Sequence, residues 1–212
     1  MSAILVRGQD GVLRGMRNAC RHRGTPAWGV VDEPTWNELN KDSAPALIEY
    51  TINADDVAGP FVQIPADLMD QAKVDGLGYS SPLEKIAERF HVSPALLQLM
   101  NRGKAFDKAD TPIWVTNVIT VAPPVAASVV VDGSDRTVTA LDGEGKVIAH
   151  YPATIGSEHD PLPVGTWKIM RVYKDPVFHY NPALFWDADP SHAKVRIQPG
   201  PNNPVGVAWI DL

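Results

Sequence analysis

Cysteine is nearly absent from this sequence, because its 212 residues include only Cys20. A single thiol excludes an internal disulfide bond and a zinc site built from several thiolates. An excess of positive charge is lacking as well, since 19 Lys and Arg face 25 Asp and Glu and the net charge is −6. This balance argues against a nucleic-acid-binding protein, whose affinity depends on neutralising phosphates.

Long hydrophobic runs are also missing. No stretch approaches the ~18 apolar residues that a membrane-spanning helix requires, so we expect no membrane span. Residues 1–7 lack the apolar core of ~7–15 residues that a signal peptide contains, so we expect no signal peptide there. Hydrophobic residues make up 44% and charged residues 21% of the sequence, which excludes wholesale disorder.

Proline, by contrast, is abundant, and its 19 residues are about twice the usual share. Paired prolines stop a β-ladder and stiffen the backbone, so Ala122-Pro123-Pro124-Val125 predicts a linker. A second boundary is predicted at Asp42-Ser43-Ala44-Pro45. These breaks predict a multidomain α+β protein with domains at 1–44, 45–122 and 125–212.

The first segment has a helical pattern. Apolar residues over 12–20 recur near the 3.6-residue period, and Asp32 is placed to cap a second helix. The stretch 29–39 resembles the closing turn and last helix of a peptidoglycan-binding-like three-helix domain, whose opening helix has no counterpart here. The resemblance implies a partial peptidoglycan-binding-like helical domain at 1–44.

The middle segment predicts a strand, two short helices and a second strand. Residues 48–52 alternate as a strand does, and 111–115 return as a strand. Ser81-Pro82 and Ser93-Pro94 each place a capping serine before a proline at the first helical position. The side chains expected to face inward from the two helices are Leu83, Ile86, Ala87, Phe90, Leu96, Leu99 and Met100.

This layout resembles a lysin-motif module. The residues that carry the resemblance are Tyr50-Thr51-Ile52, Asp55-Asp56, the stretch 84–93, and Leu96-Leu97 leading to Asn101. An insertion at roughly 57–79 separates the first strand from the first helix and departs from the family's pattern near its usual sugar-binding loop. The resemblance implies a small βααβ lysin-motif-like module at 45–122.

The third segment predicts strands and turns without a helix of useful length. Its β-rich runs are 128–132, 136–141, 146–154, 166–173, 194–198 and 205–212. We expect an all-β domain, either a sandwich or a partly closed barrel, with Trp167 and Trp209 in its core.

Five motifs in the third segment resemble the catalytic domain of L,D-transpeptidases, the bacterial enzymes that cross-link peptidoglycan stem peptides. They are Gly143-Glu144-Gly145-Lys146, Ile155-Gly156, 161–167, Tyr180-Asn181-Pro182 and 199–210. Each motif alone is weak, and it is their order and spacing that carry the resemblance. It implies that 125–212 is the N-terminal part of a mainly-β catalytic domain, that peptidoglycan is the partner, and that the protein acts in the periplasm or cell envelope.

The family implies a cysteine nucleophile that attacks a tetrapeptide stem, forms a thioester and passes the acyl group to an amine. Its catalytic groups lie in a His-Gly-Thr and a Ser-His-Gly-Cys element, just downstream of the stretch that 199–210 matches. The sequence stops at Leu212, before either element. We therefore expect a C-terminally truncated chain that is inactive as written, with no catalytic residue to assign.

Two alternatives stay open. A non-enzymatic protein could bind peptidoglycan glycan chains through the lysin-motif-like module. An enzyme could instead use Cys20, whose basic neighbours Arg17, Arg21 and Arg23 would favour the thiolate. Adjacent helical residues point about 100° apart, so Cys20 and His22 would not face each other and this alternative is the weakest.

The remaining site candidates come from the loop at 180–189 and from the motif at 199–210. The resemblance implies that Tyr180 and Trp186 of the loop, and Asn203 of the motif, flank the substrate. The alternative is that the two aromatic side chains pack the loop onto its sheet, and that Asn203 belongs to a turn between strands.

Two acidic clusters also invite a chemical role. Asp187 and Asp189 are spaced like a pair for acid–base chemistry, but beside a proline they more simply cap a turn. His159 lies between two acidic residues, yet adjacent positions cannot all converge on one ion. We therefore predict no metal site and no cofactor.

Overall fold

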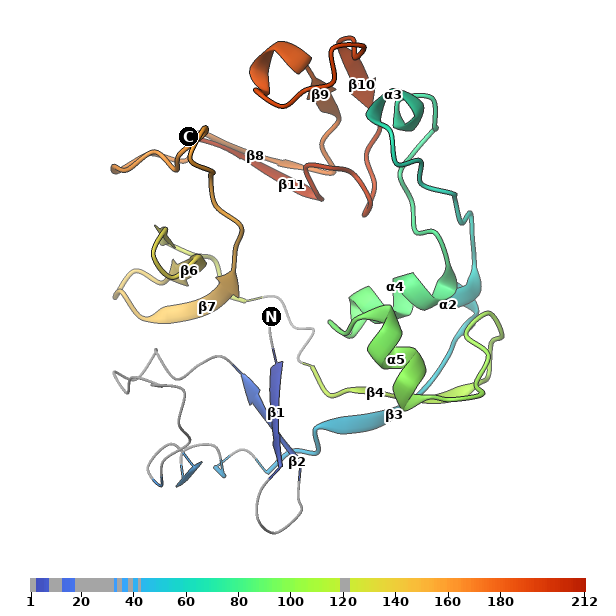
Figure 1. Ribbon diagram of the computed structural model, residues 1–212. Coiled ribbons are helices and arrows are strands. Elements are labelled where there is room, and N and C mark those ends of the chain that lie inside the picture. Colours follow the sequence, from blue (N-terminus) through green and yellow to red (C-terminus); the bar gives the residue numbers. More distant parts are fainter. Residues whose placement is uncertain are drawn as a thin grey trace. The chain divides into compact units, whose positions relative to one another are not determined.

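The computed structural model describes residues 3–7, 13–17, 33, 36–37, 40–41, 43–118 and 123–212, coloured along the chain in Figure 1. The chain divides into two compact units. One combines Met1–Glu49 with Trp114–Leu162, and the other combines Tyr50–Ile113 with Pro163–Leu212. Helices and several small sheets together give an α+β protein, as the sequence predicts.

The first described elements are two paired strands. Strand β1 (Ala3–Arg7) runs antiparallel to β2 (Leu13–Arg17), with Ala3 opposite Arg17 and Arg7 opposite Leu13. The helix predicted over 12–20 is therefore wrong at Leu13–Arg17. Pairing with a β-rich run satisfies the backbone groups of this stretch, and such a non-local partner outweighs a weak helical period.

The rest of the N-terminal segment is described at a few positions. Glu33, Trp36 and Asn37 are helical, and the Asn40 N–H donates to the Trp36 carbonyl at 2.9 Å, in agreement with the second predicted helix. Cys20 and the predicted cap Asp32 lie outside the described residues.

The strand–helix–helix–strand layout of the middle segment is confirmed. Strands β3 (Leu47–Thr51) and β4 (Pro112–Thr116) form a two-stranded sheet, and helices α4 (Pro82–Arg89) and α5 (Pro94–Met100) come between them in sequence. Both helices begin where the Ser-Pro signals place them. The hydroxyls of Ser81 and Ser93 accept hydrogen bonds from backbone N–H groups three residues on, each at 3.2 Å.

In the strand–helix–helix–strand part of this segment, the buried apolar side chains are Ile52, Ile86, Ala87, Phe90, Leu97, Ile113 and Val115. On α5 the prediction is wrong for two residues, because Leu96 and Leu99 are 39% and 55% exposed while Leu97 is fully buried. A helix of seven residues presents one narrow face to its core, and Leu97 occupies that face.

Two short helices precede α4. Helix α2 (Ala54–Val57) follows β3 and is capped by Asn53, whose side chain accepts from the Asp56 N–H. Helix α3 (Leu68–Gln71) lies inside the insertion and is capped by Asp67. The insertion thus contributes structure of its own between β3 and α4.

The third segment begins with an antiparallel three-stranded sheet. Its strands β5 (Ser128–Asp132), β6 (Thr137–Leu141) and β7 (Val147–Pro152) lie in the order β5-β6-β7, with a register shift between Ala140 and Leu141. All three strands lie within the runs that the sequence predicts. Asp132 supports the first turn, because its carboxylate accepts from the N–H groups of Ser134 and Asp135.

The remaining strands form two separate pairs. Strand β8 (Arg171–Lys174) pairs with β11 (Ala208–Asp211), and β9 (Phe178–Tyr180) pairs with β10 (Val195–Ile197). Only the end of the run predicted at 166–173 is a strand. The described strands of this segment form three small sheets, so the expected single sandwich or barrel is not what the structure contains.

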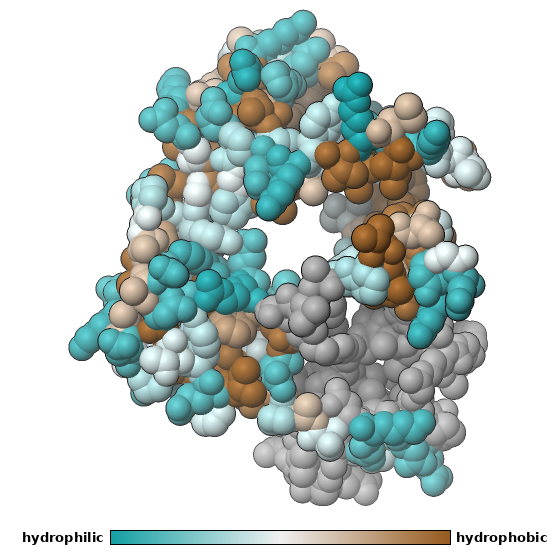
Figure 2. All heavy atoms as spheres, turned by 180° about the vertical axis from the view of Figure 1, so that it is seen from behind, coloured by the Kyte–Doolittle hydropathy of each residue, from teal (hydrophilic) through white to brown (hydrophobic). Residues whose placement is uncertain are grey.

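The β8–β11 pair leaves apolar side chains exposed. Trp167 and Trp209, both predicted to lie in a core, are 57% and 44% exposed. Two paired strands without a covering layer bury little on either face. Figure 2 shows hydrophobic side chains, in brown, reaching the surface at several places among hydrophilic ones.

Candidate functional site

The site is built on the β9–β10 hairpin. Tyr180 and Ile197, one from each strand, are buried together with Leu77 from the insertion. Partly buried apolar side chains complete this core, namely Ile64, Leu68, Met69, Ala72, Val74, Phe178 and Val195. Most of them come from the insertion, so its apolar residues are the surface on which the hairpin rests.

Backbone hydrogen bonds join the insertion to the loop after β10. The Leu77 N–H donates to the Pro199 carbonyl, and the Asn202 N–H donates to the Leu77 carbonyl, each at 3.0 Å. Gly200 permits this approach, because a Cβ there would lie 2.1 Å from the Leu77 carbonyl oxygen. The Pro199-Gly200 turn therefore packs closely against the backbone of the insertion at Leu77.

The side chain of Asn202 strengthens this junction. Its Nδ2 donates to the Gly78 carbonyl and to Oε1 of Glu84, each at 2.9 Å. Glu84 also accepts from the backbone N–H of Ser80 at 2.6 Å and from its hydroxyl at 2.5 Å. Partial burial alone would raise the pKa of Glu84, but these hydrogen bonds from Ser80 and Asn202 outweigh it and the pKa is lowered.

A hollow of about 450 Å³ opens beside the hairpin, and we call it the aromatic hollow. It is lined by Leu68, Phe178, Tyr180, Phe185, Asp187, Ala188, Asp189, His192 and Pro204. The Tyr180 ring lies 5.5 Å from that of Phe185 and 5.6 Å from that of His192, measured between centroids. The lining therefore offers apolar ring surface with two carboxylates.

A chain of polar contacts runs along one side of the aromatic hollow. The Tyr180 hydroxyl lies 3.0 Å from Nδ1 of His192, and Nε2 of His192 lies 3.2 Å from Oδ2 of Asp67. An ionised carboxylate only accepts, so Nε2 of His192 donates to Asp67, and Nδ1 is left to pair with the Tyr180 hydroxyl. Both ring nitrogens therefore have a partner, which holds the imidazole between Asp67 and Tyr180.

Asp67 is the acidic end of this chain. Its Oδ1 accepts from the Met69 N–H at 2.7 Å, and its Oδ2 faces His192. The hydrogen bond from Met69, followed by that from His192, lowers the pKa of Asp67. The same carboxylate therefore caps α3 and holds the imidazole.

Asp189 performs the turn-capping role that the sequence favours for it. Its carboxylate accepts from the Ser191 N–H at 2.8 Å and from the Ser191 hydroxyl at 2.6 Å. These hydrogen bonds lower the pKa of Asp189. Asp187 lines the aromatic hollow as well.

The structure separates the three predicted substrate-flanking residues. Tyr180 is buried and lines the aromatic hollow, whereas Trp186 is 63% exposed and does not line it. Asn203 is buried, donating from Nδ2 to the Gln198 carbonyl at 2.8 Å and accepting from the Val205 N–H at 2.9 Å. Asn203 thus shapes the turn before β11, and a role of the three residues toward substrate stays a prediction.

Of the acidic pair Asp55-Asp56 in the middle segment, Asp56 has a structural role. This fully buried carboxylate lies 2.6 Å from Nη1 of Arg89 and accepts from the Tyr50 hydroxyl at 2.5 Å and the Asn53 N–H at 3.0 Å. Burial, followed by the hydrogen bond to Asp56, raises the pKa of Tyr50. The cluster joins the end of β3 to α4.

Sequence reasoning missed the partnership of Asp67 and His192, which lie 125 residues apart. No local pattern marks such a pair. Within the described residues, no group of three or more His, Cys, Asp or Glu side chains is placed to hold a metal ion. The described helices also include none long and apolar enough to cross a membrane.

Comparison with protein families matches residues 126–210 to YkuD, the L,D-transpeptidase catalytic domain. A comparison with curated proteins gave no match. The matched range contains β5 to β10 and all of β11 except Asp211, and with them the hairpin and most of the lining of the aromatic hollow. The match of residues 126–210 therefore supports a relationship of this chain to the L,D-transpeptidase family.

Proposed function

We propose that the protein is an L,D-transpeptidase family member that works in peptidoglycan cross-linking or cell-wall remodelling, in the periplasm or cell envelope. The observation that carries the proposal is the match of 126–210 to the family's catalytic domain. The order of the modules adds support, because a lysin-motif-like layout and a partial peptidoglycan-binding-like segment precede the matched range.

We also propose that the 212-residue polypeptide does not itself catalyse acyl transfer. Residues 126–210 contain no cysteine, and the sequence has neither a His-Gly-Thr nor a Ser-His-Gly-Cys element. Thioester formation requires a thiolate with a matched base and oxyanion donors. The lining of the aromatic hollow includes one histidine, His192, and no cysteine.

Carbapenem labelling tests this proposal. Intact-mass spectrometry of the 212-residue protein with a carbapenem should show no covalent adduct. Cys20→Ser should behave like the parent protein, and a general thiol reagent serves as the control that Cys20 is reactive when reached. A stoichiometric carbapenem adduct would contradict the proposed inactivity, and its loss in Cys20→Ser would assign the reaction to that thiol.

A second candidate function is non-enzymatic binding of peptidoglycan through the lysin-motif-like module. The observation that favours it is the complete β3–α4–α5–β4 layout with its own buried side chains. Exposed Leu96 and Leu99 on α5 are apolar groups that this module presents to solvent.

Co-sedimentation with purified sacculi separates the two functions. The full chain should sediment with sacculi under both. Leu99→Ser should abolish sedimentation if the module binds the glycan, whereas Trp186→Ala should do so if the 180–189 loop binds. Both side chains are exposed, so neither change removes core packing. No sedimentation of the full chain would contradict both functions.

A further inference from the structure

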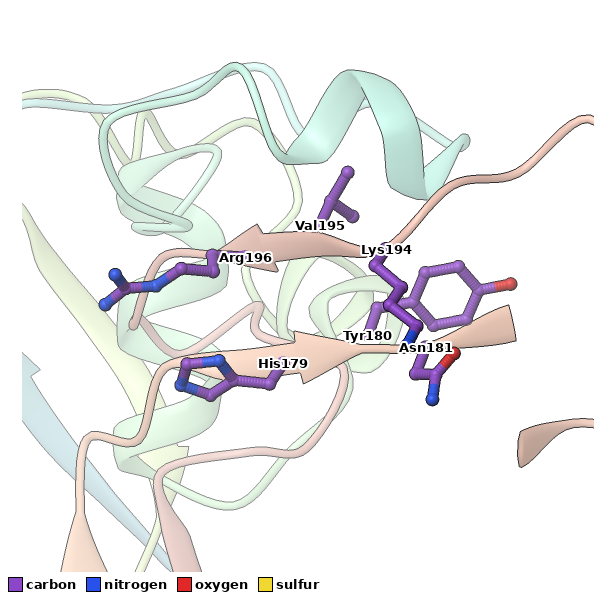
Figure 3. A pocket seen from close by; sticks show the side chains of 6 residues that line it. All are labelled: His179, Tyr180, Asn181, Lys194, Val195 and Arg196. Carbon is purple, nitrogen blue, oxygen red and sulfur yellow. The ribbon is translucent and has the colours of Figure 1, made fainter. Parts of the chain in front are cut away.

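The outer face of the β9–β10 hairpin gathers basic side chains. In the antiparallel register Val195 lies opposite Tyr180, and Arg196 lies opposite His179. Successive side chains of a strand point to opposite faces, so the face that buries Tyr180 and Ile197 is the reverse of the one that carries His179 and Arg196. Figure 3 shows these two side chains pointing the same way from neighbouring strands.

The same face continues two residues further along the hairpin. Lys194 and Asn181 come just beyond the Val195–Tyr180 pair, and Figure 3 shows them lying together beyond His179 and Arg196. The residues line a hollow of about 260 Å³, which we call the hairpin hollow. The basic side chains of His179, Lys194 and Arg196 therefore lie with the Asn181 amide on one face of the two short strands.

These basic side chains have no acidic partner in the described part of the chain. No ion pair or hydrogen bond there involves the side chains of His179, Lys194 or Arg196. Arg89 and His192, by contrast, each contact a carboxylate. The chain has a net charge of −6, so acidic residues outnumber basic ones. A general excess of basic residues therefore does not explain why three of them lie together without an acidic partner.

We infer that the hairpin hollow is a binding site for a peptide carboxylate. The planar guanidinium of Arg196 matches a carboxylate with two parallel hydrogen bonds. The His179 ring and the Asn181 amide supply further N–H donors, and Lys194 adds a positive charge. The site itself follows from the charge and the register. The choice of a peptide as ligand rests on the proposed function, since stem peptides are what peptidoglycan presents to this family.

The test uses the ¹⁵N-labelled full chain and two matched probes, N-acetyl-D-alanyl-D-alanine and its C-terminal amide. The free acid should shift the amide signals of β9 and β10 saturably, and the amide should bind about tenfold more weakly. Added salt should weaken the binding of the acid. Equal shifts from both probes would overturn the inference.

Substitutions locate the binding. Arg196→Gln and Lys194→Gln should each weaken binding of the acid about five- to tenfold. Lys104→Gln, which removes an exposed cation after α5, should leave it unchanged. Spectra that match the parent protein away from the hairpin show that each variant is folded. Unchanged affinity in both hairpin variants would overturn the site.

Two further arms separate the possible outcomes. Inorganic phosphate that displaces the acid more effectively than acetate does would overturn the assignment to a carboxylate. Sacculus binding without any effect of the peptide acid would contradict this inference alone. Peptide binding in a protein that does not sediment with sacculi would keep the site and contradict the proposed function.

Discussion

At the scale of single residues, Gly200 is a position where the fold leaves no room for a side chain. Its φ of +150° lies in a region that other residues rarely adopt, and an added Cβ would lie 2.1 Å from the Leu77 carbonyl oxygen. The obstacle is backbone, which cannot rotate away as the end of a flexible side chain can. Both the conformation and the close approach therefore require glycine here.

Gly200→Ala should lower the free energy of unfolding by more than about 2 kcal/mol. Urea denaturation with fluorescence detection measures this loss. Gly143→Ala is the matched control, because a Cβ at Gly143 would meet nothing within 4 Å. Equal stability of the two variants would show that the insertion does not hold the Pro199-Gly200 turn in solution.

Single-residue signals were the most predictable part of the fold. Ser81 and Ser93 are followed by proline and cap their helices as expected, because capping depends on neighbours within three residues. Asp67 and His192 could not be predicted as partners, because their contact depends on how the insertion meets the hairpin. A side chain's local sequence contains no information on such a partner.

At the scale of elements, helix α3 and the hairpin share one carboxylate. Asp67 caps α3 through the Met69 N–H and also contacts His192, which follows the 180–189 loop. Because these hydrogen bonds lower the pKa of Asp67 in the folded state, the ionised carboxylate stabilises the fold at pH values above its ordinary pKa. This contribution is lost as the pH falls through the lowered value.

The difference in the free energy of unfolding between the parent protein and Asp67→Asn should therefore shrink as the pH falls below about 4. Denaturant titrations between neutral and acidic pH measure it. Asp107→Asn, which removes an exposed carboxylate of the same unit, is the control for a general effect of charge. If the difference in the free energy of unfolding stays constant from neutral to acidic pH, the hydrogen bonds to Asp67 do not lower the pKa of its carboxyl group.

Elements that depend on distant partners were harder to predict than those fixed locally. Leu13–Arg17 has a helical period but is a strand, because Ala3–Arg7 pairs with it. Of the run predicted at 205–212, only Ala208–Asp211 is a strand, and this is the part that pairs with β8. In both cases the deciding hydrogen bonds come from another segment.

At the scale of the whole molecule, the compact units have different boundaries from the predicted segments 1–44, 45–122 and 125–212. The unit that contains the hairpin joins Tyr50–Ile113 to Pro163–Leu212. The insertion has its buried contacts in this unit with Tyr180 and Ile197 of the C-terminal segment. The core of the βααβ layout, by contrast, is made of side chains from within 45–122.

A polypeptide limited to 45–122 should therefore keep the β3–α4–α5–β4 core but lose the structure of its insertion. Hydrogen exchange at Leu77, whose N–H donates to Pro199 in the full chain, should become fast in the short form. Exchange at Leu97, buried on α5, should stay slow in both forms. Slow exchange at Leu77 in the short form would show that the insertion folds without the hairpin.

The junction between Gly78 and Asn202 also constrains the order of events during synthesis. These residues are 124 positions apart, so the insertion leaves the ribosome long before its partner exists. At ~5–20 residues per second, that interval is about 6–25 s. For this time the apolar residues of the insertion have no core, and a nascent chain in this state is a natural client for chaperones.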